Sequence, residues 1–147
     1  MAAWQDYLKL LGELGRTVGQ LAAIEQEKTG AVSRGDVSGV DECMKREQAL
    51  SMSLRGMDQR REKLLDQLGL KDVPLREVAD YAPEELIMDV KTAAEAVRSQ
   101  YALFQAASQV ARDTLECHLR AIEKAQAGAD GVAPPQEDHP PQADFRI

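Results

Sequence analysis

The chain has 147 residues, which fits one domain or one domain with a tail. Hydrophobic residues make up 44% of it but aromatic residues only 4%, so aliphatic side chains must pack the core, as in helical bundles and coiled coils. The formal net charge of −7 argues against nucleic acid or an anionic membrane surface as the main partner, because either would require a basic patch.

Targeting signals and cysteines define the expected compartment. No run approaches the roughly 18 consecutive apolar residues that span a bilayer, so we expect no membrane insertion. Residues 1–6 lack the basic and apolar regions of a secretory signal, so we expect a cytoplasmic protein. Cys43 and Cys117 lie far apart, each inside a helical pattern. Two buried, reduced thiols is the favoured interpretation, with a disulfide between them as the alternative.

Two long helices joined by a tight turn are predicted for the first half of the chain. Residues 7–32 and 40–68 place their seam positions at alternating steps of four and three, which is typical of packed helices. Residues 33–36 interrupt this pattern, with Gly35 suited to end one helix and Asp36 suited to cap the next. So short a connection predicts an antiparallel hairpin.

A short bridging helix and a third long helix are predicted to follow. Residues 71–81 contain Pro74 at an expected first helical position, and Pro83 opens the third helix with acids in its first turn. Residues 87–122 keep the heptad register, and a second apolar stripe makes this helix's apolar face wide enough for two neighbours. The predicted fold is all-α, a three-helix bundle or coiled coil.

The composition changes after Ala127, which divides the chain into a helical bundle domain of residues 1–127 and a tail of residues 128–147. The tail is rich in Gly and Pro, so we expect it to be flexible and disordered. It ends on Phe145-Arg146-Ile147. An arm with apolar groups at its end folds onto something, either a partner or the chain's own partner-binding groove, and the sequence leaves both open.

Three charged residues occupy seam positions of the predicted hairpin close to its turn. With the turn near Asp36, Lys28 lies opposite Glu47, and Glu25 lies beside Glu47. In one interpretation the helices splay or the side chains reach outward, and the charges stay solvated. In the other, a Lys28–Glu47 pair fixes the register of the hairpin, as polar seam residues do in some coiled coils.

The residues offer no catalytic or metal-binding pattern, so we expect neither an enzyme nor a cofactor. His118 and His139 lie far apart along the chain, and no strand precedes the glycines that would form a phosphate-binding loop. Gly12, Gly15 and Gly19 instead lie inside the first helix, each at a cost near 1 kcal/mol relative to Ala. They either only thin one helix face or let another helix approach closely.

Helical surface is therefore the expected functional element. Large apolar groups gather midway along the third helix, where they form either core against the hairpin or a groove for a partner's amphipathic helix. The candidate partner-binding residues are Leu103, Phe104, Ala107, Val110, Phe145 and Ile147.

The order of these segments resembles the FlgN family of flagellar export chaperones. Residues 24–40 are similar to the family's first-helix end and Gly-Asp turn, and residues 45–50 and 58–65 to its Arg-rich second helix. Residues 74–78 resemble the short link before its last helix, so the likeness runs from Leu8 to Ile122.

The resemblance implies a specific function. FlgN-like proteins bind the C-terminal helical regions of the hook–filament junction proteins FlgK and FlgL, keep them unassembled and deliver them to the flagellar type III export gate. The last helix and tail carry most of that binding, without nucleotide or metal. The alternatives are a coiled-coil adaptor of the secretion apparatus, which is usually more basic and lacks a third helix, and a self-assembling bundle that closes a homodimer.

Overall fold

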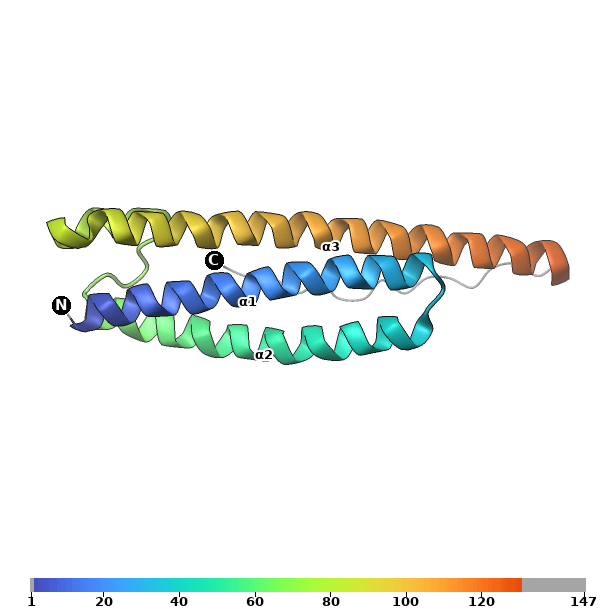
Figure 1. The fold of residues 1–147 in the computed structure, drawn as a ribbon, viewed down its shortest axis with the longest axis horizontal. Helices are drawn as coiled ribbons and strands as arrows, with labels where there is room; N and C mark the ends of the chain where they lie inside the picture. The colour runs from blue at the N-terminus through green and yellow to red at the C-terminus, as the bar shows by residue number, and fades with distance from the viewer. Residues whose placement is uncertain (1, 131–147) are drawn as a thin grey trace.

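The fold is known from a computed structural model, which describes residues 2–130. Within that range it contains helices and no strands, which confirms the all-α prediction (Figure 1). In chain order the elements are α1 (Ala2–Ser33), α2 (Val37–Gln67), the 3-10 helices η1 (Leu75–Tyr81) and η2 (Glu84–Leu86), and α3 (Ile87–Asp130).

The turn between α1 and α2 forms as its local sequence predicts. Gly35 adopts a positive φ of 69°, and the amide of Asp36 donates a 2.9 Å hydrogen bond back to the Ala31 carbonyl, which ends α1. The Asp36 carboxylate then accepts a 2.9 Å hydrogen bond from the amide of Gly39 and caps α2. Because only three residues separate the helices, α2 runs back antiparallel along α1.

The connection between α2 and α3 differs from the predicted short α-helix. Gly69 (φ 72°) ends α2, but the bridge is the 3-10 helix η1 rather than an α-helix, with Pro74 preceding it as the cap. Its apolar residues Leu75, Val78 and Ala79 are buried, and η1 packs on the start of α3. The third helix likewise begins with a 3-10 turn, η2, before α3 proper, which runs three residues past Ala127 to Asp130.

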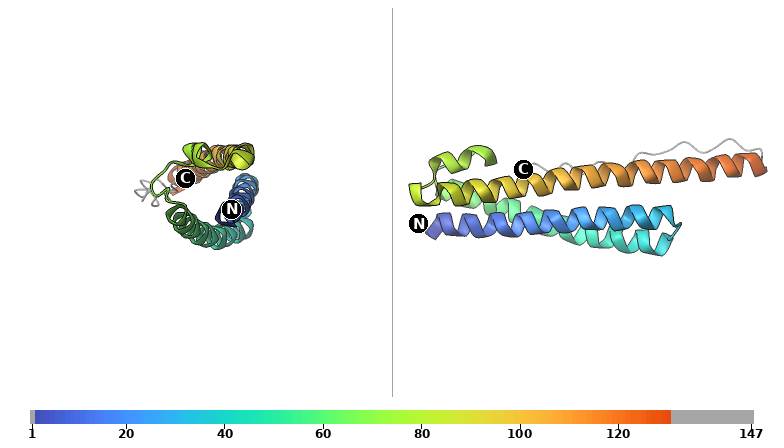
Figure 2. Two further views of the ribbon diagram at one scale, coloured as in Figure 1. Left: turned by 90° about the vertical axis from the view of Figure 1, so that its left-hand side faces the viewer. Right: turned by 45° about the horizontal axis from the view of Figure 1, so that its top comes forward.

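Helix α1 lies at the centre of the fold. It packs along both α2 and α3, whereas α2 and α3 do not pack along each other (Figure 1). Viewed end-on, the three helices form an open wedge with α1 at its apex (Figure 2). The burial of side chains agrees, because only Cys43, Leu54 and Leu65 are buried in α2.

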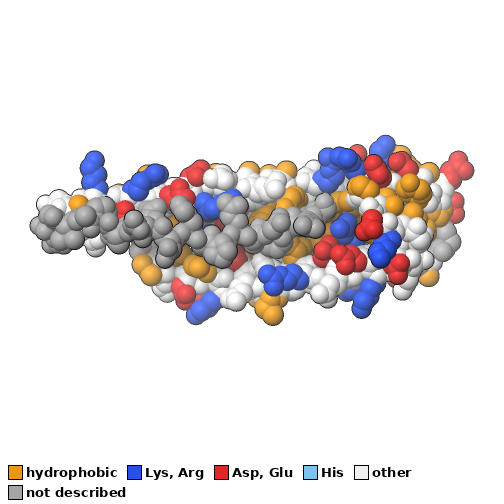
Figure 3. Space-filling model, turned by 180° about the vertical axis from the view of Figure 1, so that it is seen from behind, with side chains coloured by type: hydrophobic (Ala, Val, Ile, Leu, Met, Phe, Trp, Pro, Cys, Tyr) orange, Lys and Arg blue, Asp and Glu red, His pale blue; other side chains and the backbone are white. Residues whose placement is uncertain are grey.

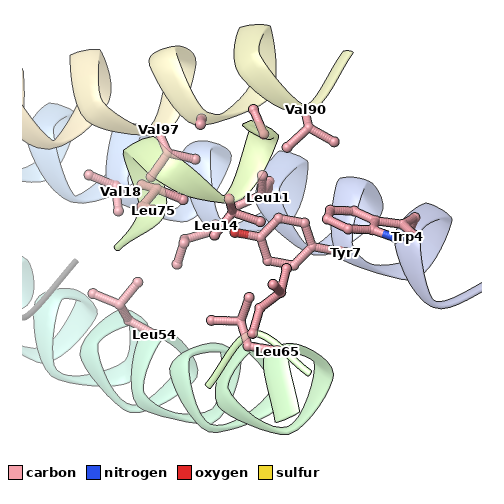
Figure 4. Packing of buried hydrophobic residues seen from close by; sticks show 14 of the residues in the cluster. Trp4, Tyr7, Leu11, Leu14, Val18, Leu54, Leu65, Leu75, Val90 and Val97 are labelled. Carbon is pink, nitrogen blue, oxygen red and sulfur yellow. The ribbon is translucent and has the colours of Figure 1, made fainter. Parts of the chain in front are cut away.

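The core is one apolar cluster shared by all three long helices and η1. Tyr7, Leu11 and Val18 of α1 are at most 1% exposed, and Val97 of α3 and Leu54 of α2 approach them from either side (Figure 4). Aliphatic residues supply most of this packing, as the composition predicted. The stripe on α1 recurs every three or four residues, which explains why a single helix face supports both neighbours.

Two glycines of α1 bring α3 close. A methyl group on Gly15 would lie 3.7 Å from Val97, and one on Gly19 would lie 2.9 Å from the side-chain oxygen of Gln100. Close approach of another helix is therefore the correct interpretation for these two residues. Gly12 faces open space, so it only thins the helix.

Helix α3 extends beyond the end of the hairpin. Because Gly15 lies beside Val97, the end of α1 at Ser33 is level with about residue 115 of α3, and the last turns of α3 extend past it (Figure 1). Leu115 belongs to the heptad register of residues 87–122 but is therefore exposed, and the expectation that both thiols are buried is wrong. Cys43 is buried, but Cys117 is exposed because no helix of the hairpin reaches it.

Replacing Gly12 by Ala should stabilise the fold by about 1 kcal/mol, because alanine favours the helix and nothing lies within 4 Å of the added methyl group. Gly15→Ala should act similarly, since its contact with Val97 is an ordinary van der Waals distance. Gly35→Ala is the contrasting control and should destabilise, because φ there is positive. Urea unfolding measures all three, and destabilisation by Gly12→Ala would contradict the account of α1.

Candidate functional site

An exposed apolar stripe runs along the middle of α3. Leu103 is 56% exposed and Val110 is 54% exposed, with the half-buried Ala107 between them. Spacings of four and three residues put all three on one helix face, which we call the outer stripe. An exposed row of this kind is a surface to which an amphipathic helix can bind.

Phe104 does not share this face. It follows Leu103 by one residue and so points about 100° away, where it is only 9% exposed. There it belongs to the core cluster, and its ring centroid lies 6.4 Å from that of Tyr101. The structure therefore separates Phe104 from the outer stripe, while Phe145 and Ile147 lie outside the described residues.

A second exposed apolar surface lies on the part of α3 that extends beyond the end of the hairpin. Leu115, Leu119 and Ile122 are 40%, 40% and 44% exposed, and we call them the end stripe. Sequence reasoning missed this surface because its heptad pattern continues that of the core. The lengths of the helices indicate this surface. A hairpin whose helices have 32 and 31 residues cannot cover the whole length of a helix of 44 residues.

The three seam charges of the hairpin meet in space and form a charge cluster. Lys28 Nζ lies 2.7 Å from Glu47 Oε1 and 3.2 Å from Glu25 Oε2, and it donates a 3.4 Å hydrogen bond to Glu25 Oε1. Glu25 is 4% exposed, whereas the side chains of Lys28 and Glu47 are each 20% exposed. The cluster is thus a partly buried ion pair with a second carboxyl group held against it.

Burial and neighbouring charge shift the protonation of this cluster. Loss of water around Glu25 raises the pKa of its carboxyl group to about 7, the hydrogen bond and charge of Glu47 add to the rise, and Lys28 opposes it. Burial disfavours the charge of Lys28, but the two carboxylates outweigh this effect and raise the pKa of its ammonium group. Lys28 and Glu47 therefore form the stable pair, and Glu25 is the group that titrates near neutral pH.

Within residues 2–130 no three His, Cys, Asp or Glu side chains come together as a metal site. Burial raises the pKa of the Cys43 thiol, which keeps it protonated and unreactive. What remains is the apolar surface of α3, which is suited to binding another helix.

The family assignment rests on a comparison of the sequence with known protein families. Residues 1–129 match the family described as FlgN protein, and this match covers every described element apart from the last residue of α3. The chain belongs to the FlgN family. No curated protein and no solved structure matches it.

Membership in the FlgN family gives the helical surfaces a general role. FlgN proteins are chaperones of flagellar protein export, so this family member has a chaperone-type role in flagellum assembly. None of the helices within residues 2–130 is both long and apolar enough to cross a membrane.

Exchanging the charges of Lys28 and Glu47 should restore stability that either single change removes. Lys28→Glu places three carboxyl groups together and Glu47→Lys leaves two ammonium groups beside one carboxyl group, so each should cost about 1–3 kcal/mol. The double variant regains an opposite-charge pair in the same place. Thermal and urea unfolding of all four proteins gives the coupling energy, and a double variant no better than the worse single variant would exclude a role in register.

The stability of this FlgN protein should depend on pH because Glu25 titrates with a raised pKa. Its pKa rises from 4.5 to about 7 on folding, so between these pH values the folded state keeps a proton that the unfolded chain releases. The resulting stabilisation is complete below pH 4.5 and is lost as the pH rises to 7, by about 3 kcal/mol in total.

Glu25→Gln cannot ionise and should remove this pH dependence. Relative to the unmodified protein, the variant should gain stability between pH 4.5 and 7 and keep that gain at higher pH. Comparison of the two proteins cancels the titration of all other groups. Urea unfolding at several pH values measures the difference, and a difference that does not vary with pH would contradict the raised pKa.

Proposed function

We propose that the chain is a cytoplasmic chaperone for hook–filament junction proteins of the FlgK and FlgL type. It binds their C-terminal helical regions, keeps them unassembled and presents them to the flagellar export gate. The single observation that carries the proposal is the exposed apolar surface of α3, formed by the outer stripe and the end stripe. Family membership supports the general role, and the stripes supply a place for the client.

The physical driving force would be burial of apolar side chains on both partners. A client helix that assembles with its neighbours in the filament carries an apolar face, which aggregates when exposed in the cytoplasm. Covering one leucine side chain contributes about 1.5–3 kcal/mol, so a few residues of α3 suffice for a stable but reversible complex. Binding alone performs this task, so neither a catalytic group nor a metal is required.

The two stripes suggest that the client contributes two apolar segments. Twelve residues separate Leu103 from Leu115, which turns the end stripe about 120° around α3 from the outer stripe. A single straight helix covers only one of these faces. Two client segments, or one segment that wraps around α3, would cover both, and Phe104 would stay in the core throughout.

Substituting residues of the stripes should weaken client binding without unfolding the protein. Leu103→Asp and Leu119→Asp should each weaken binding about 10-fold to 100-fold, because each puts a charge into the proposed interface. The melting temperature should change little, since both side chains are at least 40% exposed. Calorimetric titration with the C-terminal segments of FlgK- and FlgL-like proteins from the same genome measures the affinity.

Met52→Asp is the matched control for these substitutions. Met52 is also exposed, at 66%, but it lies on α2 away from both stripes, so binding should be unchanged. Full-affinity binding by both α3 variants would remove α3 from the proposed interface. Sedimentation of the free protein in parallel shows whether the same stripes instead close a homodimer.

A further inference from the structure

A pocket lies between the last turns of α2 and the segment that leads into η1. Its volume is about 640 Å³, within the range of about 300–1,000 Å³ that is typical of small-ligand sites. Leu65 and Leu75 form its buried apolar walls, each 5% exposed, together with the half-buried Val73. The residues that line it belong to α2 and to positions 71–75, so this pocket is separate from the stripes of α3.

Arg61 is the least exposed charged residue of the pocket. Its side chain is 13% exposed, and the apolar walls surround it. The other charged residues that line the pocket are all exposed: Glu62, Lys63, Asp66, Lys71 and Asp72. These carry both signs, and acidic and basic side chains are interspersed at this end of the molecule (Figure 3, right). The charges of the rim therefore nearly cancel, and the charge inside the pocket is positive.

The protein leaves part of the hydrogen-bonding capacity of Arg61 unused. Its Nε lies 3.4 Å from Asp58 Oδ1, beyond the roughly 2.7–2.9 Å of a charge-assisted hydrogen bond, and it forms no hydrogen bond with the described residues. Burying a donor without an acceptor costs free energy. A ligand that brings an acceptor into the pocket would recover this cost.

Tyr7 holds the guanidinium of Arg61 without supplying that acceptor at full strength. Tyr7 is 0% exposed and shares the apolar cluster with Leu65 (Figure 4). Burial raises the pKa of its hydroxyl, and the charge and hydrogen bonding of Arg61 oppose the rise, which places the two groups against each other. Because arginine donates but cannot accept, the proton of the Tyr7 hydroxyl also lacks an acceptor among the described residues.

We propose that this pocket binds the carboxyl terminus of a partner polypeptide whose last residue is aliphatic. The carboxylate accepts hydrogen bonds from Arg61, since a planar guanidinium matches two carboxylate oxygens, and the aliphatic side chain packs on Leu65 and Leu75. A chain terminus carries both groups on one carbon atom, so a single pocket with a cation beside an apolar wall can hold both. The proposal does not rest on the client or on the α3 surfaces described above.

Short peptides added to the full-length protein test this site. The probe is acetyl-Ala-Ala-Leu with a free carboxyl group. Its amide removes the charge, and acetyl-Ala-Ala-Ala removes the aliphatic side chain. The free acid should shift the methyl NMR signals of Leu65, Val73 and Leu75, which line the pocket. Each altered peptide should bind at least about 10-fold more weakly, because it loses one of the two interactions.

Arg61→Met removes the guanidinium and keeps an unbranched apolar side chain in its place. The variant should bind the free acid only as weakly as the unmodified protein binds the amide. Arg60→Met is the matched control, because the neighbouring Arg60 is 57% exposed, lies outside the pocket lining and pairs with Glu13. Its affinity for the free acid should be unchanged, and circular dichroism shows whether both variants fold.

Three results would overturn the proposal. Equal affinity of the unmodified protein for the free acid and the amide would do so whether or not Arg61→Met folds. Equal binding of acetyl-Asp-Leu-amide would replace the chain terminus by an internal acidic residue. Methyl shifts at Leu103 and Val110 instead of the pocket residues would move peptide binding to the outer stripe.

Discussion

Burial of α1 on two sides is the constraint on which the rest of the structure depends. Thirteen of its residues are buried against only three in α2, and it alone among the long helices packs along both of the others. Its glycines at 15 and 19 give α3 a close approach, while larger side chains such as Leu14 fill the cluster. Because α2 and α3 depend on α1 rather than on each other, a wedge between them follows directly.

Near the hairpin turn, the charge cluster lowers the stability of this arrangement. The stripe of α1 that carries Tyr7, Leu14 and Val18 continues into Glu25, so a carboxyl group occupies a position where a leucine would pack. The Lys28–Glu47 pair compensates only one of the two carboxylates, and Glu25 responds with a pKa of about 7. A partly buried ion pair adds little net stability, and we propose that this one disfavours slipped registers, which would leave its charges unpaired.

Local chemistry could be predicted from the sequence, but the reach of each helix could not. Gly35 and Asp36 specify a turn by their own backbone and side-chain preferences, so the hairpin and its register followed from a few residues. Heptad spacing, in contrast, indicates only which face is apolar. It gave Leu115 the same register as the buried residues of α3 because it carries no information on where the partner helix ends, and it could not show that α1 is central.

The separation between core and exposed stripe determines how a small chaperone remains folded while offering apolar surface. Phe104 and Leu103 are neighbours in sequence, yet one is 9% exposed in the core and the other 56% exposed on the outer stripe. If the client bound core residues, releasing it would require the bundle to open and close again, at a cost comparable to its whole stability. If binding is confined to the stripes of α3, as we propose, the bundle stays intact, and client exchange needs only the surface contacts to break.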